Sequence, residues 1–193
     1  NVLESPAVTA ITRIAFDHED KLGTTLGAIA GEKAGIAKPG VPIVVGPLGQ
    51  EARASIEGIA AATGAPIVHA LADAPAKAIV DAASLALAGA HQRENATVAC
   101  VLATRIGIDD RSIARGLASA RWPGRLERVS AFGTTFLLDA AHNPDGAAAL
   151  AAHVRALGIP REKVALVFGA LADKAWPSML DTLAPLARVR IYV

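Results

Sequence analysis

Two groups of residues have types and spacing that suit chemistry, and the first lies near the N-terminus. It contains Asp17-His18 and then Lys33, fifteen residues after His18. An imidazole can hold a ligand or a metal ion, and a lysine on an apolar helical face is costly to bury unless it is neutralised or paired. The structural alternative is that Lys33 pairs with Glu32 or extends into water, and spacing alone favours it.

The second group is the segment 138–144, with the sequence LDAAHNP. Asp139 ends an expected strand, and Asn143-Pro144 opens an expected helix. A helix N-terminus suits phosphate, and an acid at the preceding strand end can accept a ribose hydroxyl. A plain helix cap explains Asn143 and Pro144 equally well but gives Asp139 and His142 no task. The residues by themselves leave both interpretations open.

Single polar residues elsewhere are weaker candidates. Asn95 carries the donor and acceptor that an adenine edge requires, although an ordinary helix cap is the favoured reading of its pattern. Arg125 follows Pro-Gly, which could fix it towards a phosphate, although most arginines on turns are solvated. Asp173-Lys174 follows a strand and either lines a cleft or forms a polar loop. We interpret His69 and His153 as structural.

The elements that position the first group alternate between strand and helix. Apolar runs predict strands, helical spacing predicts helices, and the segments follow in the order 7–16, 23–36, 41–45, 51–62 and 65–70. This order predicts a parallel sheet, in which ligands gather at the carboxyl ends of the strands. Lys33 shares a helical stripe with Leu26 and Ile29, so we expect it to face inward.

The second half is again α/β in pattern. Helices are predicted at 95–105, from Asp109 or Asp110 to 120, at 144–157 and at 177–186, and strands at 126–131, 134–138, 164–168 and 189–193. The alanine-rich stretch 71–90 is the expected domain boundary. We therefore predict one domain over 1–88 and another over 89–193.

Composition excludes several classes of protein. The 193 residues are 52% hydrophobic, which excludes a disordered chain, and 19 basic against 18 acidic residues leave a net charge of +1. We therefore expect neither nucleic acid nor a membrane as a partner. The single cysteine fits a reducing cytoplasm. The chain starts with Asn and stops where a strand has just begun, so we expect it to be part of a longer protein.

Five segments, taken in order, resemble one family. They are 17–40 (DHEDKLGTTLGAIAGEKAGIAKPG), 91–96 (HQRENA), 122–127 (WPGRLE), 138–144 (LDAAHNP) and 167–174 (VFGALADK). Together they resemble the folylpolyglutamate synthase/dihydrofolate synthase branch of the Mur ligase superfamily. The resemblance implies the end of a central ATPase domain with a parallel sheet, followed by a Rossmann-like C-terminal domain. The Gly-rich phosphate loop and the acidic magnesium ligand of the family are absent from the 193 residues, so we do not expect this chain alone to turn over.

The resemblance also implies a reaction. ATP would phosphorylate a carboxylate of dihydropteroate or folate, and L-glutamate would attack the acyl phosphate to form an amide. The expected protein is a cytoplasmic monomer that uses ATP and Mg²⁺. The alternatives are a Mur-type ligase acting on a peptidoglycan precursor, or a non-catalytic α/β module that binds a nucleotide.

Individual roles follow from the same resemblance. His18 would ligate magnesium, and Lys33 would be carbamylated, which makes it both catalytic and a metal ligand. Asn95 would contact adenine and Arg125 the phosphates. Asp139 would bind the ribose, and His142 would bind the ribose-phosphate region and act as a catalytic residue. The site would form when two domains close, because closure excludes water from the acyl phosphate.

Overall fold

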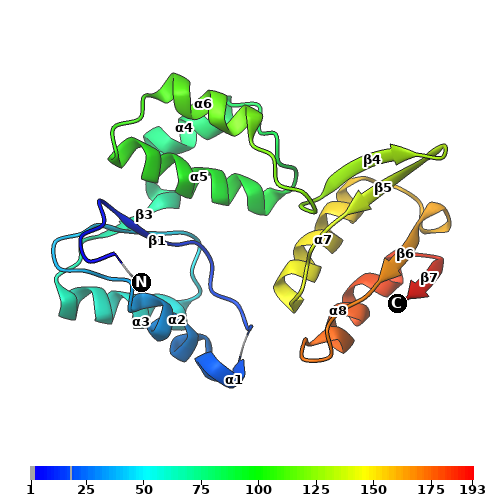
Figure 1. Cartoon of the computed structure of the whole chain (residues 1–193), viewed down its shortest axis with the longest axis horizontal. Coiled ribbons are helices and arrows are strands. Elements are labelled where there is room, and N and C mark those ends of the chain that lie inside the picture. The colour runs from blue at the N-terminus through cyan, green and yellow to red at the C-terminus, as the bar shows by residue number, and fades with distance from the viewer. Residues whose placement is uncertain (1–2, 18) are drawn as a thin grey trace. The chain divides into compact units, whose positions relative to one another are not determined.

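The computed structural model describes residues 3–17 and 19–193. The chain divides into two compact units, each a mixture of helices and strands, which confirms the α/β prediction (Figure 1). Unit 1 comprises Asn1–Ala86 with Gln92–Arg121, and unit 2 comprises Leu87–His91 with Trp122–Val193. The predicted limits 1–88 and 89–193 divide the chain into two domains of the family, whereas the two units are groups of residues that pack compactly. The predicted limits therefore stay a prediction.

Unit 1 is built on a short parallel sheet. Its strands are β1 (Thr9–Ile11), β2 (Ile43–Val45) and β3 (Ile67–His69), in that spatial order. The expected strand over 7–16 is therefore too long. Two backbone hydrogen bonds of 2.9 Å mark the ends of the pairing between β1 and β2. The Thr9 N–H donates to the Pro42 carbonyl at one end, and the Gly46 N–H donates to the Ile11 carbonyl at the other.

Helices α2 (Leu26–Ala34) and α3 (Gln50–Thr63) pack against one face of this sheet, and the one-turn helix α1 (Glu19–Leu22) precedes them (Figure 1). The core on this side is made of small and branched residues: Ile11, Ala30, Ala34, Ala37, Ile43, Val45, Ala52, Ile56, Ala60 and Ala65. Thr25 caps α2, and Gly64, with φ of 75°, ends α3 in the left-handed conformation that glycine adopts without strain. The predicted 51–62 helix is confirmed.

Three helices lie on the other side of the sheet: α4 (Ala74–Ala82), α5 (Ala90–Arg105) and α6 (Asp110–Ser119). A 3₁₀ turn, Ala70–Ala72, leads into α4. Their core residues are Val44, Ala70, Ala76, Val80, Ala96, Val98, Cys100, Val101 and Ile113. The middle strand therefore sends Ile43 and Val45 into one core and Val44 into the other, as expected for a strand buried on both faces.

The surroundings of two titratable side chains in this part of unit 1 shift their pKa values. Of the two predicted caps, Asp109 and Asp110, it is Asp109 that caps α6, and the Ser112 hydroxyl and backbone N–H donate to it at 2.8 and 2.9 Å. These bonds hold the pKa of the Asp109 carboxyl below its ordinary value. Burial raises the pKa of the Cys100 thiol, so Cys100 behaves as a core residue.

Unit 2 begins with an antiparallel hairpin. Strands β4 (Glu127–Ala131) and β5 (Thr134–Leu138) are joined by Phe132 and Gly133, with φ of 52° and 70°. Two successive residues with positive φ are the signature of the tight turn that matches the twist of a hairpin. The hairpin and its turn were predicted at these positions.

The rest of unit 2 packs two helices on a parallel strand pair. Helix α7 (Pro144–Ala156) leads through a 3₁₀ turn, Arg161–Lys163, to β6 (Ala165–Phe168), and α8 (Trp176–Leu183) leads through a second, Ala184–Leu186, to β7 (Val189–Tyr192). The core of this part consists of Ala147, Ala151, Met179 and Leu183, with Leu150, Leu166, Phe168 and Leu186 packed against it. All four residues of β7 are exposed. Over the described residues, no helix is both long and apolar enough to cross a lipid bilayer.

Candidate functional site

The predicted metal site falls partly outside what the structure describes. His18 lies outside the described residues, and Asp17 and helix α1 flank it in sequence. Among the described residues, no group of three or more His, Cys, Asp or Glu side chains could hold a metal ion. The assignment of His18 as a magnesium ligand therefore stays a prediction.

Lys33 occupies the last turn of α2, and there the structure corrects the sequence analysis. The buried residues of this helix are Ile29, Ala30 and Ala34, whereas Lys33 is exposed. The expected inward orientation of Lys33 is therefore wrong, and the exposure agrees with the favoured alternative, in which the long side chain carries its ammonium out to water from the edge of an apolar face. A burial penalty therefore no longer argues for carbamylation, and the role of Lys33 as metal ligand and catalytic residue stays a prediction.

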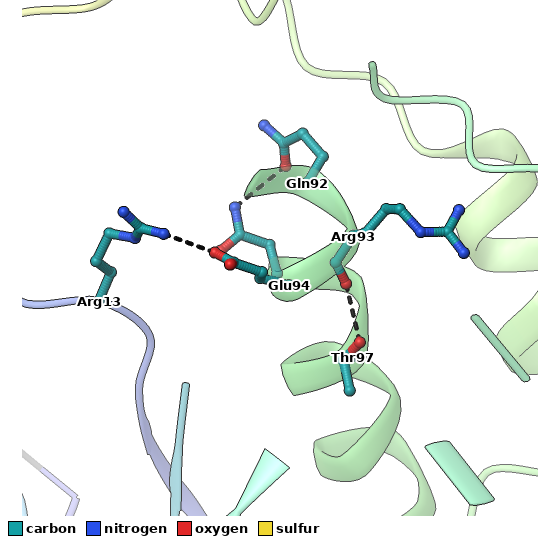
Figure 2. A network of polar contacts seen from close by, with 6 residues as sticks. Arg13, Gln92, Arg93, Glu94 and Thr97 are labelled. Atoms are coloured by element: carbon teal, nitrogen blue, oxygen red, sulfur yellow. Dashed lines mark hydrogen bonds and ion pairs between the residues drawn. The ribbon is translucent and has the colours of Figure 1, made fainter. Parts of the chain in front are cut away.

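The N-terminal end of α5 carries a network of polar contacts (Figure 2). The Asn95 amide nitrogen donates to Gln92 Oε1 at 3.2 Å, one helical turn back. The guanidinium of Arg13, two residues beyond β1, donates to Glu94 at 2.7 Å. The network therefore ties the start of α5 to the carboxyl end of a sheet strand, where parallel sheets place their ligands.

Two further contacts hold the same helical turn. Arg93 forms an ion pair with Asp81 of α4 at 2.6 Å, and the Thr97 hydroxyl donates to the Arg93 carbonyl at 2.9 Å. Asn95 is the sixth residue of α5, because the helix starts at Ala90 rather than at 95. The reading of Asn95 as a helix cap is therefore wrong. The compact grouping puts Asn95 in unit 1 with Lys33, although the sequence analysis placed it in the C-terminal domain.

In unit 2, Asp139 joins the two loops that the sequence analysis singled out. Its Oδ2 accepts the Leu126 N–H and its Oδ1 accepts the Ala141 N–H, both at 2.9 Å. The Ala140 N–H also donates to the Gly124 carbonyl at 2.7 Å. The half-buried carboxylate thus fastens the loop after β5 to the Pro-Gly-Arg turn before β4. Asp139 has a structural task that the sequence analysis did not foresee.

The Pro-Gly-Arg turn has an unusual backbone at its end. Leu126 has φ of 50° and is 3% exposed, and the Gly124 N–H donates to Glu127 at 2.9 Å. A branched residue with positive φ is strained, so the surrounding bonds must hold it. The neighbouring Arg125 is half-buried, and within the described part of the chain its guanidinium has no hydrogen bond or ion pair. A half-buried cation without an anion is suited to receive one from a ligand.

Asn143 and His142 lie at the start of α7. The Asn143 side chain accepts the Gly146 N–H at 2.9 Å, so it is the N-cap that the sequence predicted, with Pro144 in the first helical position. His142 is exposed, and its Nδ1 lies 3.0 Å from the Ala140 carbonyl oxygen. This contact orients the imidazole on the same loop that Asp139 fastens.

The remaining polar candidates are Lys174, His69 and His153. The side chain of Lys174 is only 13% exposed, and its Nζ lies 3.8 Å from Asp173. His69 lies 3.8 Å from Glu57. His153 Nε2 is buried without a hydrogen-bond partner. The last two agree with their interpretation as structural histidines.

Sequence reasoning missed the residues that hold the candidates in place. The contact between Gln92 and Asn95 joins positions three apart on a helix, a spacing that brings side chains together and could have been recognised. The pair Arg13 and Glu94 is 81 residues apart and left no such signal. The same holds for Glu51, which accepts the Gly27 N–H in the first turn of α2 at 2.9 Å.

Known proteins match this chain in sequence. Residues 124–193 match the family model for the Mur ligase glutamate ligase domain. The dihydrofolate synthase/folylpolyglutamate synthase of Bacillus subtilis is 35% identical over 97% of this chain, and the folylpolyglutamate synthase of Lacticaseibacillus casei is 31% identical over 93%. The chain spans about half the length of these relatives, 48% and 46% respectively.

Solved structures match it in fold. A folylpolyglutamate synthase complex with AMPPCP and folate aligns with a TM-score of 0.84 at 30% identity, over 98% of this chain and 51% of that one. The enzyme of Mycobacterium tuberculosis complexed with ADP and AMPPCP aligns with a TM-score of 0.81 at 26% identity, over 99% and 48%. Since the sequence matches span both units and the fold agrees over almost every residue, the chain belongs to the folylpolyglutamate synthase/dihydrofolate synthase family of the Mur ligase superfamily.

Proposed function

We propose that this chain is part of an ATP-dependent ligase that adds L-glutamate to dihydropteroate, to folate, or to both. The names of its relatives support this proposal, because they pair the synthesis of dihydrofolate with that of folylpolyglutamate. A similar structure carries AMPPCP together with folate, which are an ATP analogue and a candidate substrate. In the proposed reaction a carboxylate becomes an acyl phosphate, and the amine of glutamate then displaces the phosphate.

The observation that carries the proposal is the carboxylate clamp of Asp139. It holds Leu126 and Ala141 at 2.9 Å each, so the turn bearing Arg125 and the loop bearing His142 form one rigid piece. Phosphoryl transfer builds negative charge on oxygen atoms, and it is accelerated by cations and N–H groups that are already in place. Arg125, whose guanidinium has no internal partner in the described part of the chain, is carried on this clamped turn and can supply such a cation.

The proposed nucleotide contacts are argued residue by residue, each from its own surroundings. Arg125 binds phosphate oxygens, and His142 contacts the ribose-phosphate region near the N-terminal end of α7, where the helix dipole favours an anion. Asp139 keeps further lone pairs beside its two backbone bonds, and these can accept a ribose hydroxyl. Asn95 contacts the adenine base. ATP, when bound, supplies the phosphoryl group that activates the carboxylate.

Magnesium fits the described residues less well. The described part of the chain holds no cluster of metal-ligating side chains, and the remaining ligands in the proposal are His18 and a carbamylated Lys33. We therefore derive no step through a protein-held metal ion. The exposed position of Lys33 leaves its amine accessible to CO₂, which is compatible with carbamylation.

Ligase assays test this function with three acceptors. The protein expressed from its complete gene is given ATP and L-glutamate with dihydropteroate, folate or a UDP-sugar peptidoglycan precursor, and release of ADP is measured. We expect release with the first or second acceptor only. Arg125→Ala should raise the KM for ATP by about tenfold to a hundredfold, since a hydrogen bond to a charged group is worth about 1.5–3 kcal/mol.

The control for this assay is Arg128→Ala. Arg128 is an exposed arginine of β4, so its loss removes the same charge without touching the clamped turn, and the KM for ATP should not change. Turnover with the UDP-sugar acceptor alone would replace the proposal with a Mur-type peptidoglycan ligase. Nucleotide binding without any ligation would leave the binding-module alternative.

We infer a monomer in the cytoplasm for the complete protein. The single cysteine is buried and free, so the described fold needs no disulfide and suits a reducing compartment. Its partners in this proposal are small molecules: ATP, L-glutamate, and dihydropteroate or folate. A net charge of +1 gives no general attraction for nucleic acid.

A further inference from the structure

A primary amide can read a purine only if it faces one way. The Asn95 side chain ends in a carbonyl oxygen that accepts and an NH₂ group that donates, and the two exchange places when the amide turns by a half-rotation. Adenine presents a donor at its 6-position, whereas hypoxanthine presents an acceptor there. The orientation of the Asn95 amide therefore decides which of these bases it favours.

We propose that Gln92 is a positioning residue that fixes the orientation of the Asn95 amide and thereby sets a preference for adenine over hypoxanthine. The inference rests on the proposed function, in which Asn95 contacts the base. It is carried by the 3.2 Å bond from Asn95 Nδ2 to Gln92 Oε1. This bond uses one N–H of Asn95 and leaves its other N–H and its carbonyl oxygen for a ligand.

The turned orientation is unfavourable as long as Gln92 stays as it is. It would place Asn95 Oδ1 against Gln92 Oε1, so that two acceptors would face each other without a proton between them. Gln92 is only 9% exposed and therefore has little room to turn with its partner, whereas Asn95 is exposed and accessible to a ligand. A buried acceptor beneath an exposed amide is the arrangement expected when the first orients the second.

The helical turn that carries the pair is held from two sides. Arg13 binds Glu94 at 2.7 Å from the segment after β1 (Figure 2). Asp81 of α4 binds Arg93 at 2.6 Å. These contacts hold Gln92 and Asn95 in place relative to the sheet. Gln92 therefore orients the amide, while its neighbours locate it.

The test compares ATP with ITP, which differ only in the base. We measure kcat and KM for both nucleotides in the ligase reaction of the complete protein, in wild type, Gln92→Met and Gln92→Glu. A well-placed bidentate amide discriminates between bases by about 1–3 kcal/mol, so the wild type should favour ATP by about tenfold or more in KM. Gln92→Met removes the acceptor and should bring the ratio below about threefold with kcat unchanged. Gln92→Glu restores an acceptor and should restore the preference.

Matched variants guard against a simple loss of structure. Arg105→Ala removes an exposed arginine from the last turn of the same helix, away from the contacts that hold the pair, and it should leave the ATP/ITP ratio at the wild-type value. Gln92→Ala removes the same acceptor with a smaller side chain and replaces Gln92→Met if circular dichroism shows that variant to be unfolded. Rescue by Gln92→Glu separates orientation from packing, because methionine fills the space and glutamate supplies the acceptor.

The outcomes separate this inference from the proposed function. An unchanged preference in Gln92→Met, with normal ligation, overturns the role of Gln92 and leaves the ligase proposal standing. A wild type that ligates but does not distinguish ATP from ITP also overturns the role of Gln92 alone. A wild type without ATP-dependent ligation overturns both.

Discussion

Asp139, a residue that the sequence singled out for chemistry, has a structural task in the folded chain. A carboxylate offers two oxygen atoms, and each of these takes a backbone N–H, from Leu126 and Ala141. The resemblance to the family pointed to a ribose contact for this residue. The structure adds that the carboxylate also stabilises a positive φ at Leu126, which a branched residue adopts only under constraint.

Replacing Asp139 separates its two tasks. Asp139→Asn keeps one carbonyl oxygen but turns an NH₂ group towards a second backbone N–H, so one bond is lost and two donors face each other. We expect the free energy of unfolding to fall by about 1–3 kcal/mol in urea titrations, the usual cost of an unsatisfied half-buried group.

The control for this prediction is Asp181→Asn on α8. The Asp181 side chain is exposed and makes no hydrogen bond within the described part of the chain, so the effect should stay within about 0.5 kcal/mol. If Asp139→Asn keeps the wild-type stability but loses nucleotide binding, the carboxylate acts on the ligand alone and the clamp has no energetic role.

At the scale of elements, the strands of unit 1 are shorter than their apolar runs. Each of the three strands pairs over three residues, although the pattern around β1 predicts a strand of ten residues, 7–16. Gly46 lies where β2 leaves the sheet, and a Cβ at this position would lie 2.0 Å from the Thr12 carbonyl oxygen. The two strands therefore approach closely only because Gly46 has no side chain.

Adding that carbon tests the close approach. Gly46→Ala places a methyl group against the rigid backbone, which must move β1 away from β2. We expect a loss of about 3 kcal/mol or more in the free energy of unfolding, at the upper end for overpacking, measured by chemical denaturation. The mobile end of a side chain could give way at such a site, but a strand carbonyl cannot.

The matched control is Gly58→Ala in α3. Gly58 has open space around the position of a Cβ and lies inside a helix, so alanine should stabilise the protein by about 0.5–1 kcal/mol. Equal effects of the two substitutions would show that the strands can separate at little cost, and would contradict the importance of Gly46.

At the scale of the whole molecule, the two units have separate hydrophobic cores. Unit 1 has one core on each side of its sheet, and unit 2 has a smaller core centred on Met179 and Leu183. None of the described residues belongs to the cores of both units. Each unit therefore has its own source of stability.

Separate cores predict separate responses to core substitutions. Ile56 and Met179 are both completely buried, in unit 1 and unit 2 respectively. We expect calorimetry to show two unfolding transitions. Ile56→Ala should lower the midpoint temperature of one transition, and Met179→Ala that of the other. Each substitution should reduce the free energy of unfolding of its own unit by about 2–5 kcal/mol, the range for truncating a large core side chain.

The control is Leu171→Ala, which truncates a residue of unit 2 that is 71% exposed and should shift neither transition. A single transition that both core substitutions shift equally would show that the cores unfold as one. It would then be wrong to treat the two units as separate sources of stability.

The sequence by itself determined the α/β class, most helices and strands, the start of α7 at Asn143-Pro144, and the family. These properties depend on residues close together in the chain, on apolar periodicity and on motif order, so local patterns reveal them. Boundaries were less accurate at β1 and α5, because pairing and packing decide where an element stops.

Only the tertiary structure decided how the candidate residues are held. The exposure of Lys33, the clamp that Asp139 makes on Leu126 and the bond between Arg13 and Glu94 all depend on contacts that the folded chain creates. Residue type and spacing indicate which groups can do chemistry. Burial and contacts between distant segments decide which of them are fixed, because both arise only when elements pack together.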